Sequence, residues 1–408
     1  MQRAIIIGGG AAGYFAAIAC AEANPEMEVI VLEKSQNVLQ KVKISGGGRC
    51  NVTHACFDPR ELVEYYPRGE KELLGPFHRF QPSDVMEWFA DRGVELKIEE
   101  DNRVFPTSND SQTIIDCLEM MAESNGVQVL TGHAVTDLRR DEERSKWLIK
   151  TNADSFEADS VLVAGGSSKV LWGLLKKLGH HIINPAPSLF TFNIRDKRIK
   201  GLSGISLTNG EVAVANSDLV ESGPLLITHW GLSGPGVLKL SSWGAFDLAD
   251  RSYFFPILVN WVADLEQEEV IEALVEEKEA NPRKRIQNHA MFGIPLRLWK
   301  ALAEHAKIKH TDNWADISNK KLEDFINEIT ACFLQVTGKS TYKDEFVTAG
   351  GVDLKEIDFK RFESKMHPGL FMAGEILNID ALTGGFNFQA AWTGGWLAGH
   401  AMAGEELE

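Results

Sequence analysis

The sequence predicts one α/β domain that is interrupted by a β-rich segment and then by a helical segment. Three observations lead to this prediction. Buried-strand patterns alternate with helical patterns up to about residue 178, and a glycine-rich turn directly follows the first strand. Between Pro187 and Phe346 this alternation is lost, and after Phe346 it returns. The two ends of the chain are therefore expected to build one domain, with the middle of the chain as an insertion.

The first unit of the α/β pattern is a strand, a tight turn and a helix. Residues 4–7 form a short β-branched run that stops at the glycines of residues 8–13 and passes into the alanine-rich stretch 15–23. Residues 29–32 are a second buried strand, which closes on Glu33. Because the helix connects the two strands in a right-handed crossover, we expect them to be parallel neighbours.

Further elements continue the α/β pattern as far as residue 178. We predict helices over residues 83–92, with Ser83 as the cap, and 109–124, and strands over residues 126–130, 146–151 and 161–164. The last of these strands ends in a second glycine turn, Gly165 and Gly166.

The middle of the chain has a different pattern. Short alternating runs such as residues 211–215 and 253–259 are β signals without helical crossovers. An acidic helical region follows, with helices predicted over residues 265–279, 295–306 and 321–332, and the chain closes with a helix over 387–402. The predicted domains are the discontinuous α/β domain 1–189 and 346–408, the β subdomain 190–264 and the helical subdomain 265–345.

The first glycine turn has the spacing Gly8-x-Gly10-x-x-Gly13. Glycines at this spacing allow a tight turn, a close approach of the backbone to a pyrophosphate, and close packing of the helix on the strand. Glu33 follows 20 residues later at the end of the second strand, where a carboxylate can bind a ribose 2′-OH. The alternative is a plain glycine turn with a surface glutamate. We interpret the pattern as a dinucleotide site, and Glu33 disfavours a 2′-phosphate there.

Two later glycine clusters suit the same kind of ligand. Residues 44–51 read ISGGGRCN, which fits either backbone N–H groups lying against a ligand or a flexible loop. Gly374, Glu375 and Asp380 precede residues 383–387, TGGFN, which open the last helix, so a second helix N-terminus can point at a ligand. The clusters from the two ends of the chain meet only if the middle is an insertion.

The charge balance favours a small-molecule ligand. The 408 residues carry a formal net charge of -16 with a pI near 5.2, and 44% of them are hydrophobic. A polyanion is repelled by such a surface, so nucleic acid and anionic membranes are not expected as partners. No run approaches the roughly 20 apolar residues that span a bilayer, and no signal peptide precedes residue 4.

The cysteines indicate neither a disulfide framework nor a zinc site. They are five in number, sparse, and without any Cys-x-x-Cys pair. Cys50 and Cys56 are separated by five residues, so each is interpreted as a plain buried or loop thiol and not as half of a redox pair. We expect a cytoplasmic protein.

Several motifs together resemble one known family. They are, in chain order, the first glycine turn with Glu33, Lys41 with SGGGRCN (45–51), RVFP (103–106), LVAGGS (162–167), THWGLSGP (228–235) and the AGE to FQ segment (373–389). The chain resembles the bacterial BaiN-like flavoproteins, which also include aminoacetone oxidases, over essentially its whole length. The resemblance implies a two-dinucleotide-binding-type, Rossmann-like FAD domain with β-barrel-like and helical insertions.

The resemblance also implies which residues bind non-covalent FAD. Gly8, Gly10, Ala12 and Gly13 would cradle the pyrophosphate, Glu33 would bind the adenosine ribose, and Val135 would meet the adenine through its backbone. Ser45, Gly47, Arg49, Cys50 and Asn51 would line the flavin side, Gly374 and Glu375 would reach the ribityl chain, and Gly385, Phe386 and Asn387 would lie against the isoalloxazine. Further expected cofactor residues are Lys34, Lys41, Gly46, Ala164, Gly165, Asp380 and Gly384.

The chain departs from the family pattern at three places. After Gly166 the usual Pro and Gly-Ser-Thr-Gly-Asp-Gly stretch is replaced by residues 168–172. The usual Asp-x-Asp-Gly is Asn378-Ile379-Asp380-Ala381, and the usual Gly-Gly-Tyr-Asn is Gly384-Gly385-Phe386-Asn387. These departures leave the substrate open.

The predicted function is that of an FAD-dependent oxidoreductase acting on a small organic substrate. In one form NAD(P)H, as a transient co-substrate, reduces the flavin, which then reduces an activated C=C bond. In a second form a small amine or aminoketone is oxidised and O₂ reoxidises the flavin. A third alternative is a flavoprotein that acts on tRNA, which the net charge disfavours.

No catalytic residue is assigned from the sequence. His229 lies in the β subdomain, which by the resemblance covers the flavin, and an imidazole there can act as an acid or base. The alternative is a structural imidazole that hydrogen-bonds its own loop.

Overall fold

The computed structural model describes residues 2–340 and 347–405. The chain forms two compact units, Met1–Ala186 with Val347–Glu408, and Pro187–Phe346. Among the described residues, no helix is both long and apolar enough to cross a bilayer.

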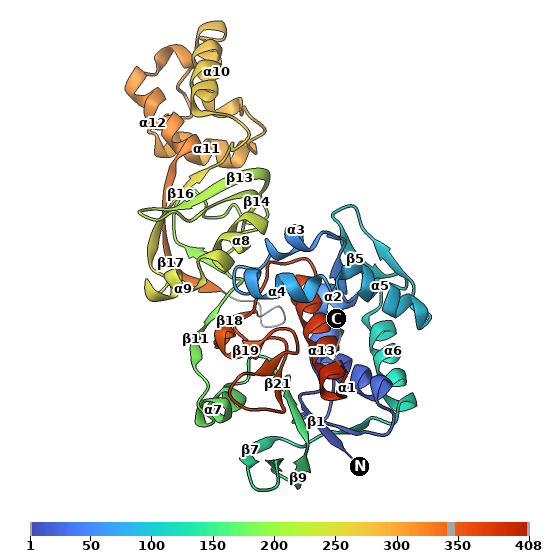
Figure 1. The fold of residues 1–408 in the computed structure, drawn as a ribbon. Helices are drawn as coiled ribbons and strands as arrows, with labels where there is room; N and C mark the ends of the chain where they lie inside the picture. The colour runs from blue at the N-terminus through green and yellow to red at the C-terminus, as the bar shows by residue number, and fades with distance from the viewer. Residues whose placement is uncertain (1, 341–346, 406–408) are drawn as a thin grey trace. The chain divides into compact units, whose positions relative to one another are not determined.

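The first unit is built on a seven-stranded sheet (Figure 1). Its strand order is β19-β20-β21-β10-β1-β2-β6, and the last five strands in this order are parallel. The strands are β1 (Arg3–Ile7), β2 (Glu28–Leu32), β6 (Gln128–Leu130), β10 (Ser160–Val163), β19 (Ile357–Asp358), β20 (Glu363–Ser364) and β21 (Leu370–Met372). β21 follows the insertion in sequence but pairs with β10, so both ends of the chain share one sheet.

Two helices from opposite ends of the chain, α1 (Ala11–Ala23) and α13 (Phe386–Met402), lie side by side in this unit (Figure 1). A Cβ atom added at Gly395 would lie 2.5 Å from the Ala12 carbonyl oxygen, and one at Gly399 would lie 2.5 Å from that of Ala16. Only glycine permits this approach. Both helices therefore run in the same direction, with backbone packed on backbone.

The other elements of the first unit surround this core. They are the helices α2 (Gln40–Gly48), α3 (Pro59–Val63), α4 (Glu70–Phe77), α5 (Pro82–Asp91), α6 (Ser111–Ser124) and α7 (Lys169–Lys177); the antiparallel sheets of β3 (Thr53–His54), β4 (Leu96–Ile98) and β5 (Arg103–Pro106), and of β7 (Val135–Asp141), β8 (Lys146–Thr151) and β9 (Ser155–Ala158); the pair β11 (Ile182–Pro187) and β18 (Thr348–Val352); and the 3₁₀ turn η3 (Leu354–Glu356).

Some predicted element ends were wrong because local capping decides them. Ser83 is not the cap of α5, because Pro82 occupies the first turn and the Gln81 side chain forms a capping box with Asp84. Asp110 caps α6 by accepting a hydrogen bond from the Gln112 N–H, so this helix does not begin at residue 109.

The second unit contains a closed six-stranded antiparallel barrel. Its order is β12-β15-β14-β13-β16-β17, and β17 pairs again with β12. The strands are β12 (Thr191–Ile194), β13 (Ser206–Val214), β14 (Val220–Ile227), β15 (Gly231–Ser233), β16 (Phe255–Asn260) and β17 (Cys332–Ser340), with α8 (Pro235–Trp243) and α9 (Ala245–Asp250) beside them. Closure leaves no free sheet edge in the barrel.

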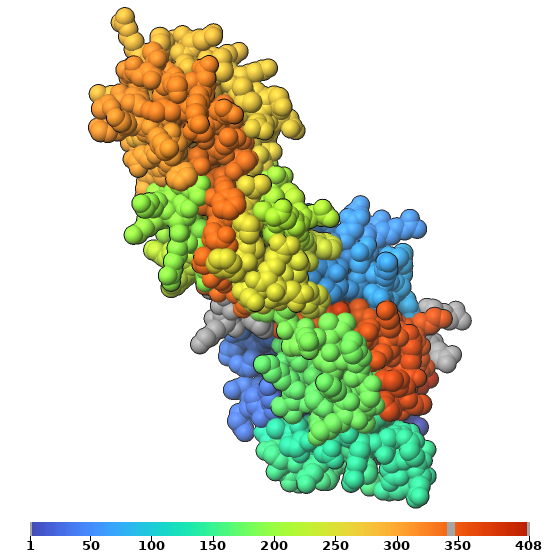
Figure 2. Space-filling model, turned by 90° about the vertical axis from the view of Figure 1, so that its left-hand side faces the viewer, coloured from blue at the N-terminus to red at the C-terminus, as the bar shows by residue number. Residues whose placement is uncertain are grey.

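The helical segment is inserted between two paired barrel strands, β16 and β17. It contains α10 (Gln267–Ala280), η1 (Ile286–Asn288), α11 (Leu296–His305), η2 (Trp314–Asp316) and α12 (Asn319–Thr330). Figure 2 shows the orange chain that leads from these helices down between the green and yellow parts of the barrel.

The overall fold class is confirmed, since a Rossmann-type α/β domain, a barrel and helices are all present. Two details within the second unit were wrong. Cys332 begins a barrel strand and does not end a helix, so the helical subdomain does not extend over residues 265–345. Residues 341–345, also assigned to it, lie outside the described part of the chain.

Candidate cofactor site

The turn between β1 and α1 needs two of its glycines for packing and leaves space at the third. A Cβ atom at Gly8 (φ +118°) would lie 2.5 Å from the Ala164 carbonyl oxygen, and one at Gly13 would lie 1.9 Å from that of Gly8. At Gly10 an added Cβ would meet no heavy atom within 4 Å. No described side chain caps α1, so its first N–H groups face this open space.

Glu33 is held at the end of β2 beside the turn. Its carboxylate accepts hydrogen bonds from the Gly9 N–H at 2.8 Å and from the N–H and hydroxyl of Ser35, each at 2.8 Å. A carboxylate has about four lone-pair sites, so acceptor capacity remains for a ribose hydroxyl. The segment that carries Val135 lies alongside, because the His133 N–H donates to the Glu33 carbonyl oxygen. Lys34 points to solvent.

Residues 44–51 contain the end of a kinked helix and the turn that follows it. α2 extends over Gln40–Gly48 with a kink where Ser45 is extended (ψ 152°) and Gly46 and Gly47 have positive φ. A Cβ atom added at Gly46 would lie 2.9 Å from the Asn51 backbone nitrogen. A Cβ atom added at Gly47 would have no heavy atom within 4 Å. The kink thus leaves bare backbone where a flat ligand can approach.

The three residues after this kink have different environments. Arg49 pairs with Glu99 at 2.7 Å, and its guanidinium lies 3.9 Å from the centroid of the Phe105 ring. Cys50 is fully buried, and burial raises the pKa of its thiol to about 12. The Asn51 side-chain oxygen is buried without a described hydrogen-bond partner. Of the three, Asn51 is the residue that still needs a donor.

Glu375 joins the C-terminal part of the site to α2. It forms an ion pair with Lys41, 334 residues away in the sequence. Gly374 lies against α1, because an added Cβ would be 3.4 Å from the Cβ of Ala12. On neighbouring β18, the Thr348 hydroxyl is buried without a described partner. The expected ribityl segment therefore lies beside both the first turn and the second glycine cluster.

The Asp380 carboxylate is occupied by another residue of the chain. Its side chain is completely buried and pairs with Arg68. A carboxylate in the core requires such a partner, because desolvation would otherwise expel it or protonate it.

The loop before α13 is held by its own side chains. The Asn387 side chain accepts from the Ala381 N–H and donates to the Ala381 carbonyl oxygen, each at 3.0 Å. Gly384 and Gly385 have positive φ, and a Cβ at Gly385 would lie 2.5 Å from the Thr53 carbonyl oxygen. A ligand at this end of α13 would therefore meet backbone and not the Asn387 amide.

His54 is a site residue that the sequence analysis missed. The rings of His54, Tyr65 and Phe386 form a cluster, with centroids 4.5 Å apart for His54 and Phe386, 4.1 Å for Tyr65 and Phe386, and 5.7 Å for His54 and Tyr65. The Nδ1 atom of His54 is buried without a described partner, and burial lowers the pKa of this imidazole. No sequence pattern indicates this residue, because β3 meets α13 only in the folded chain.

The described residues fit FAD. The N-termini of α1 and α13 point the same way and are staggered by eight residues, about 12 Å at 1.5 Å per residue. Two positive helix ends in this arrangement suit a pyrophosphate and a ring system farther along one ligand. The buried oxygens of Asn51 and Thr348 without described partners, and the open space at Gly10, Gly47 and Gly48, are consistent with a bound group that has both donors and acceptors.

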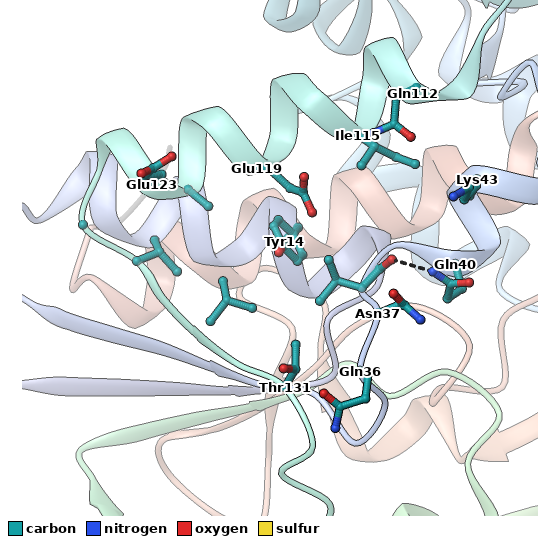
Figure 3. Close-up of a pocket in the computed structure, with 15 residues that line it drawn as sticks. Tyr14, Gln36, Asn37, Gln40, Lys43, Gln112, Ile115, Glu119, Glu123 and Thr131 are labelled. Carbon is teal, nitrogen blue, oxygen red and sulfur yellow. Dashed lines mark hydrogen bonds between the residues drawn. The ribbon is translucent and has the colours of Figure 1, made fainter.

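A separate pocket of about 590 Å³ lies beside this site (Figure 3). Amide side chains of the segment after β2 and carboxylates of α6 line it around Tyr14. Burial, followed by the charges of Glu119 and Glu33, raises the pKa of the Tyr14 phenol. None of the predicted cofactor residues is among those that line it.

His229 does not have the structural role that was the alternative to catalysis. The Thr228 hydroxyl, and not the imidazole, accepts hydrogen bonds from the Trp230 and Gly231 N–H groups at 3.2 Å. His229 is exposed and makes no hydrogen bond to another described residue.

Comparisons with known proteins agree on one family and one fold. The model of the HI0933-like protein Rossmann domain matches residues 2–401. The 3-dehydro-bile acid delta(4,6)-reductase of Clostridium scindens is 28% identical over 99% of both chains, and the ribosomal RNA dihydrouridine synthase of Haemophilus influenzae is 28% identical over 95% of both. The structure of 3-ketosteroid-delta4-(5alpha)-dehydrogenase from Rhodococcus jostii aligns with a TM-score of 0.53 at 14% identity, covering 98% of this chain and 97% of that one.

Proposed function

The chain belongs to the HI0933-like family, and from this membership we propose that it reduces a C=C bond conjugated to a carbonyl group, with NAD(P)H as the donor. The expected family and the expected class, an FAD-dependent oxidoreductase, are confirmed by the family match and by the reductase relative. The bond that is reduced and the electron donor are the proposed part.

The observation that carries the proposal is the chemistry shared by two relatives with different substrates. A 3-dehydro-bile acid with a Δ4 double bond is an enone, and the enzyme of Clostridium scindens is named for reducing it. Dihydrouridine is uridine with its C5=C6 bond reduced, and that bond is conjugated to the C4 carbonyl. Both names describe hydrogen addition to a double bond that a neighbouring carbonyl activates.

The residues of the chain would bind and orient the cofactor for this reduction. FAD, when bound, supplies the hydride. The glycines at positions 8, 10 and 13 would let the pyrophosphate approach the first backbone N–H groups of α1, and Glu33 would accept a hydrogen bond from the ribose. The positive end of α13 adds favourable charge near residues 384–387, where the flavin ring is expected.

The direct test is anaerobic flavin spectroscopy of the holoprotein. We expect NADH or NADPH to bleach the flavin absorbance and an enone such as 2-cyclohexenone to restore it, whereas cyclohexanone does not. If instead a panel of primary amines and aminoketones bleaches the flavin and NAD(P)H does not, the protein is an oxidase of the kind considered above. Flavin that neither donor reduces would also contradict the proposal.

A second candidate substrate is a uridine of ribosomal RNA, which the Haemophilus influenzae relative favours. The net charge of -16 argues against a large RNA interface, because phosphate contacts require clustered cations. Incubating the NADPH-reduced protein with ribosomal RNA and analysing its nucleosides by mass spectrometry separates the two. Appearance of dihydrouridine, without turnover of free enones, would favour the RNA substrate.

A further inference from the structure

β17 switches the direction of its side chains near its end. Cys332, Leu334 and Val336 are completely buried inside the barrel, while Phe333 is 53% exposed. Strict alternation would carry Gly338 to the inside and Lys339 to the outside.

A β-bulge prevents this. Ile194 of β12 lies opposite Val336, but Phe192 lies opposite Lys339, so two steps along β12 correspond to three along β17. The extra residue reverses the alternation that follows it. Because directly opposed residues of an antiparallel pair share a face, Lys339 lies on the same face as Phe192, which is completely buried. The bulge therefore turns a lysine toward the interior at one end of the barrel.

The Lys339 ammonium lies among aromatic rings. Its nitrogen is 5.0 Å from the ring centroid of Tyr253 and 6.0 Å from that of Phe190, and these two rings meet edge to face at 5.4 Å. The side chain is partly exposed, and burial lowers the pKa of its ammonium. Within residues 2–340 and 347–405, no carboxylate forms an ion pair with it and no acceptor forms a hydrogen bond with it.

Burial removes part of the hydration of the Lys339 ammonium, and no described carboxylate lies beside it to replace that hydration. Cation–π contact compensates only part of the hydration that burial removes. An anion at the same place would restore the missing interaction. The mouth of a closed barrel is also a recurring location of small-ligand sites.

We propose that this end of the barrel binds the carboxylate of a small organic acid, with Lys339 as the charged partner and the half-buried ring of Tyr253, which packs on Phe190, as the surface for its apolar ring. A carboxylate fits better than a phosphate. One ammonium offers few donors, and the neighbouring rings offer none toward their faces, whereas a phosphate requires several charge-assisted hydrogen bonds. The proposal concerns binding to the barrel and does not depend on the proposed reaction.

The test compares benzoate with its neutral isostere benzamide by calorimetry on the FAD-loaded protein. We expect benzoate to bind more tightly than benzamide, and Lys339→Met to weaken benzoate by about tenfold or more while leaving benzamide unchanged. Lys339→Arg should retain most of the preference for benzoate. Lys307→Met, at an exposed lysine of the same unit, is the matched control and should bind both probes as the unchanged protein does.

Three results would overturn the proposal. The unchanged protein could bind benzoate and benzamide with equal affinity, or it could fail to bind benzoate. Alternatively, Lys339→Met could weaken the binding of both probes by the same factor. Flavin content and the thermal unfolding midpoint of each variant show whether it is folded. If Lys339→Met does not fold, the test uses Lys339→Arg instead. A Lys339→Arg protein that binds benzoate no more tightly than benzamide would contradict the charged contact.

Discussion

The Arg68 guanidinium forms an ion pair with the Asp380 carboxylate in the interior of the first unit, although the two residues are 312 positions apart in the sequence. The side chain of Asp380 is 0% exposed and that of Arg68 is 10% exposed. The same two residues also form an isolated backbone bridge. This pair ties the segment between α3 and α4 to the loop that leads into α13.

Replacing Arg68 should therefore destabilise the protein strongly. Arg68→Met leaves the Asp380 carboxylate buried and without its main partner, which lowers the free energy of unfolding by about 3–5 kcal/mol. Urea unfolding followed by tryptophan fluorescence measures this. Adding Asp380→Asn to Arg68→Met should recover part of the loss, because the uncompensated charge is gone. Arg144→Met, in an exposed pair with Glu157, is the control and should have little effect. A similarly small effect of Arg68→Met would contradict the buried pair.

The glycines of the first turn should separate folding from cofactor binding. Gly13→Ala forces a methyl group to within about 1.9 Å of the Gly8 carbonyl oxygen, so we expect a loss of about 3 kcal/mol in unfolding free energy. Gly10→Ala meets no protein atom within 4 Å, so it should fold normally and lose FAD affinity, because its methyl group occupies the space of the pyrophosphate. Flavin absorbance and unfolding midpoints measure the two effects.

The exposed helical Gly173 gives the matched control for these substitutions. Its Cβ position is open, so Gly173→Ala should keep FAD and gain about 0.5–1 kcal/mol of stability. Full FAD retention by Gly10→Ala would show that the pyrophosphate does not lie at this turn.

All five cysteines should be unreactive in the native protein. They are free and buried, and burial raises the pKa of Cys20, Cys50 and Cys332 to about 12 and that of Cys117 to about 11. With Ellman's reagent near pH 8 we expect almost no rapid reaction before denaturation and five thiols after it. Cys56, at 9% exposure, should react first. A fast native reaction of Cys50 would contradict its buried position.

His180 should make the stability of the first unit depend on pH. The imidazole is almost completely buried against Glu356 and Ser364, and burial, which outweighs the opposing effect of Glu356, lowers its pKa from 6.5. The unfolded chain then binds this proton more readily than the folded chain. The stability contributed by neutral His180 is therefore complete above about pH 6.5 and decreases as the pH falls toward the folded pKa.

Urea unfolding midpoints between pH 7.5 and pH 5 would measure this dependence, with the unchanged protein compared with His180→Asn. The variant should show a flatter pH dependence, whatever its absolute stability. A variant curve parallel to that of the unchanged protein would exclude His180 as the source.

Much of the first unit follows from local sequence. The β-branched run before the first glycine turn, the alanine-rich helix after it and the second strand ending at Glu33 predict the central βαβ unit, since buried parallel strands and glycine turns have strong local signatures. The loss of alternation after Pro187 and its return after Phe346 likewise indicate that a β-rich segment and a helical segment interrupt this domain, whereas the barrel was expected only from the family resemblance. These signals depend only on residues that are close together in the chain, so a single sequence is enough to detect them.

What only the tertiary structure decided depends on contacts between distant segments. Asp380 carries the same local pattern as a cofactor residue, yet Arg68 occupies its carboxylate. His54 has no motif, and it joins the site because β3 packs on α13. Strict alternation along β17 predicts that the Lys339 side chain points outward. The bulge adds one residue to β17 opposite β12, and this reverses the direction of the side chain. Periodicity and glycine spacing determine which elements form, whereas ion pairing, stacking and strand register depend on which distant residues meet, and no local pattern encodes that.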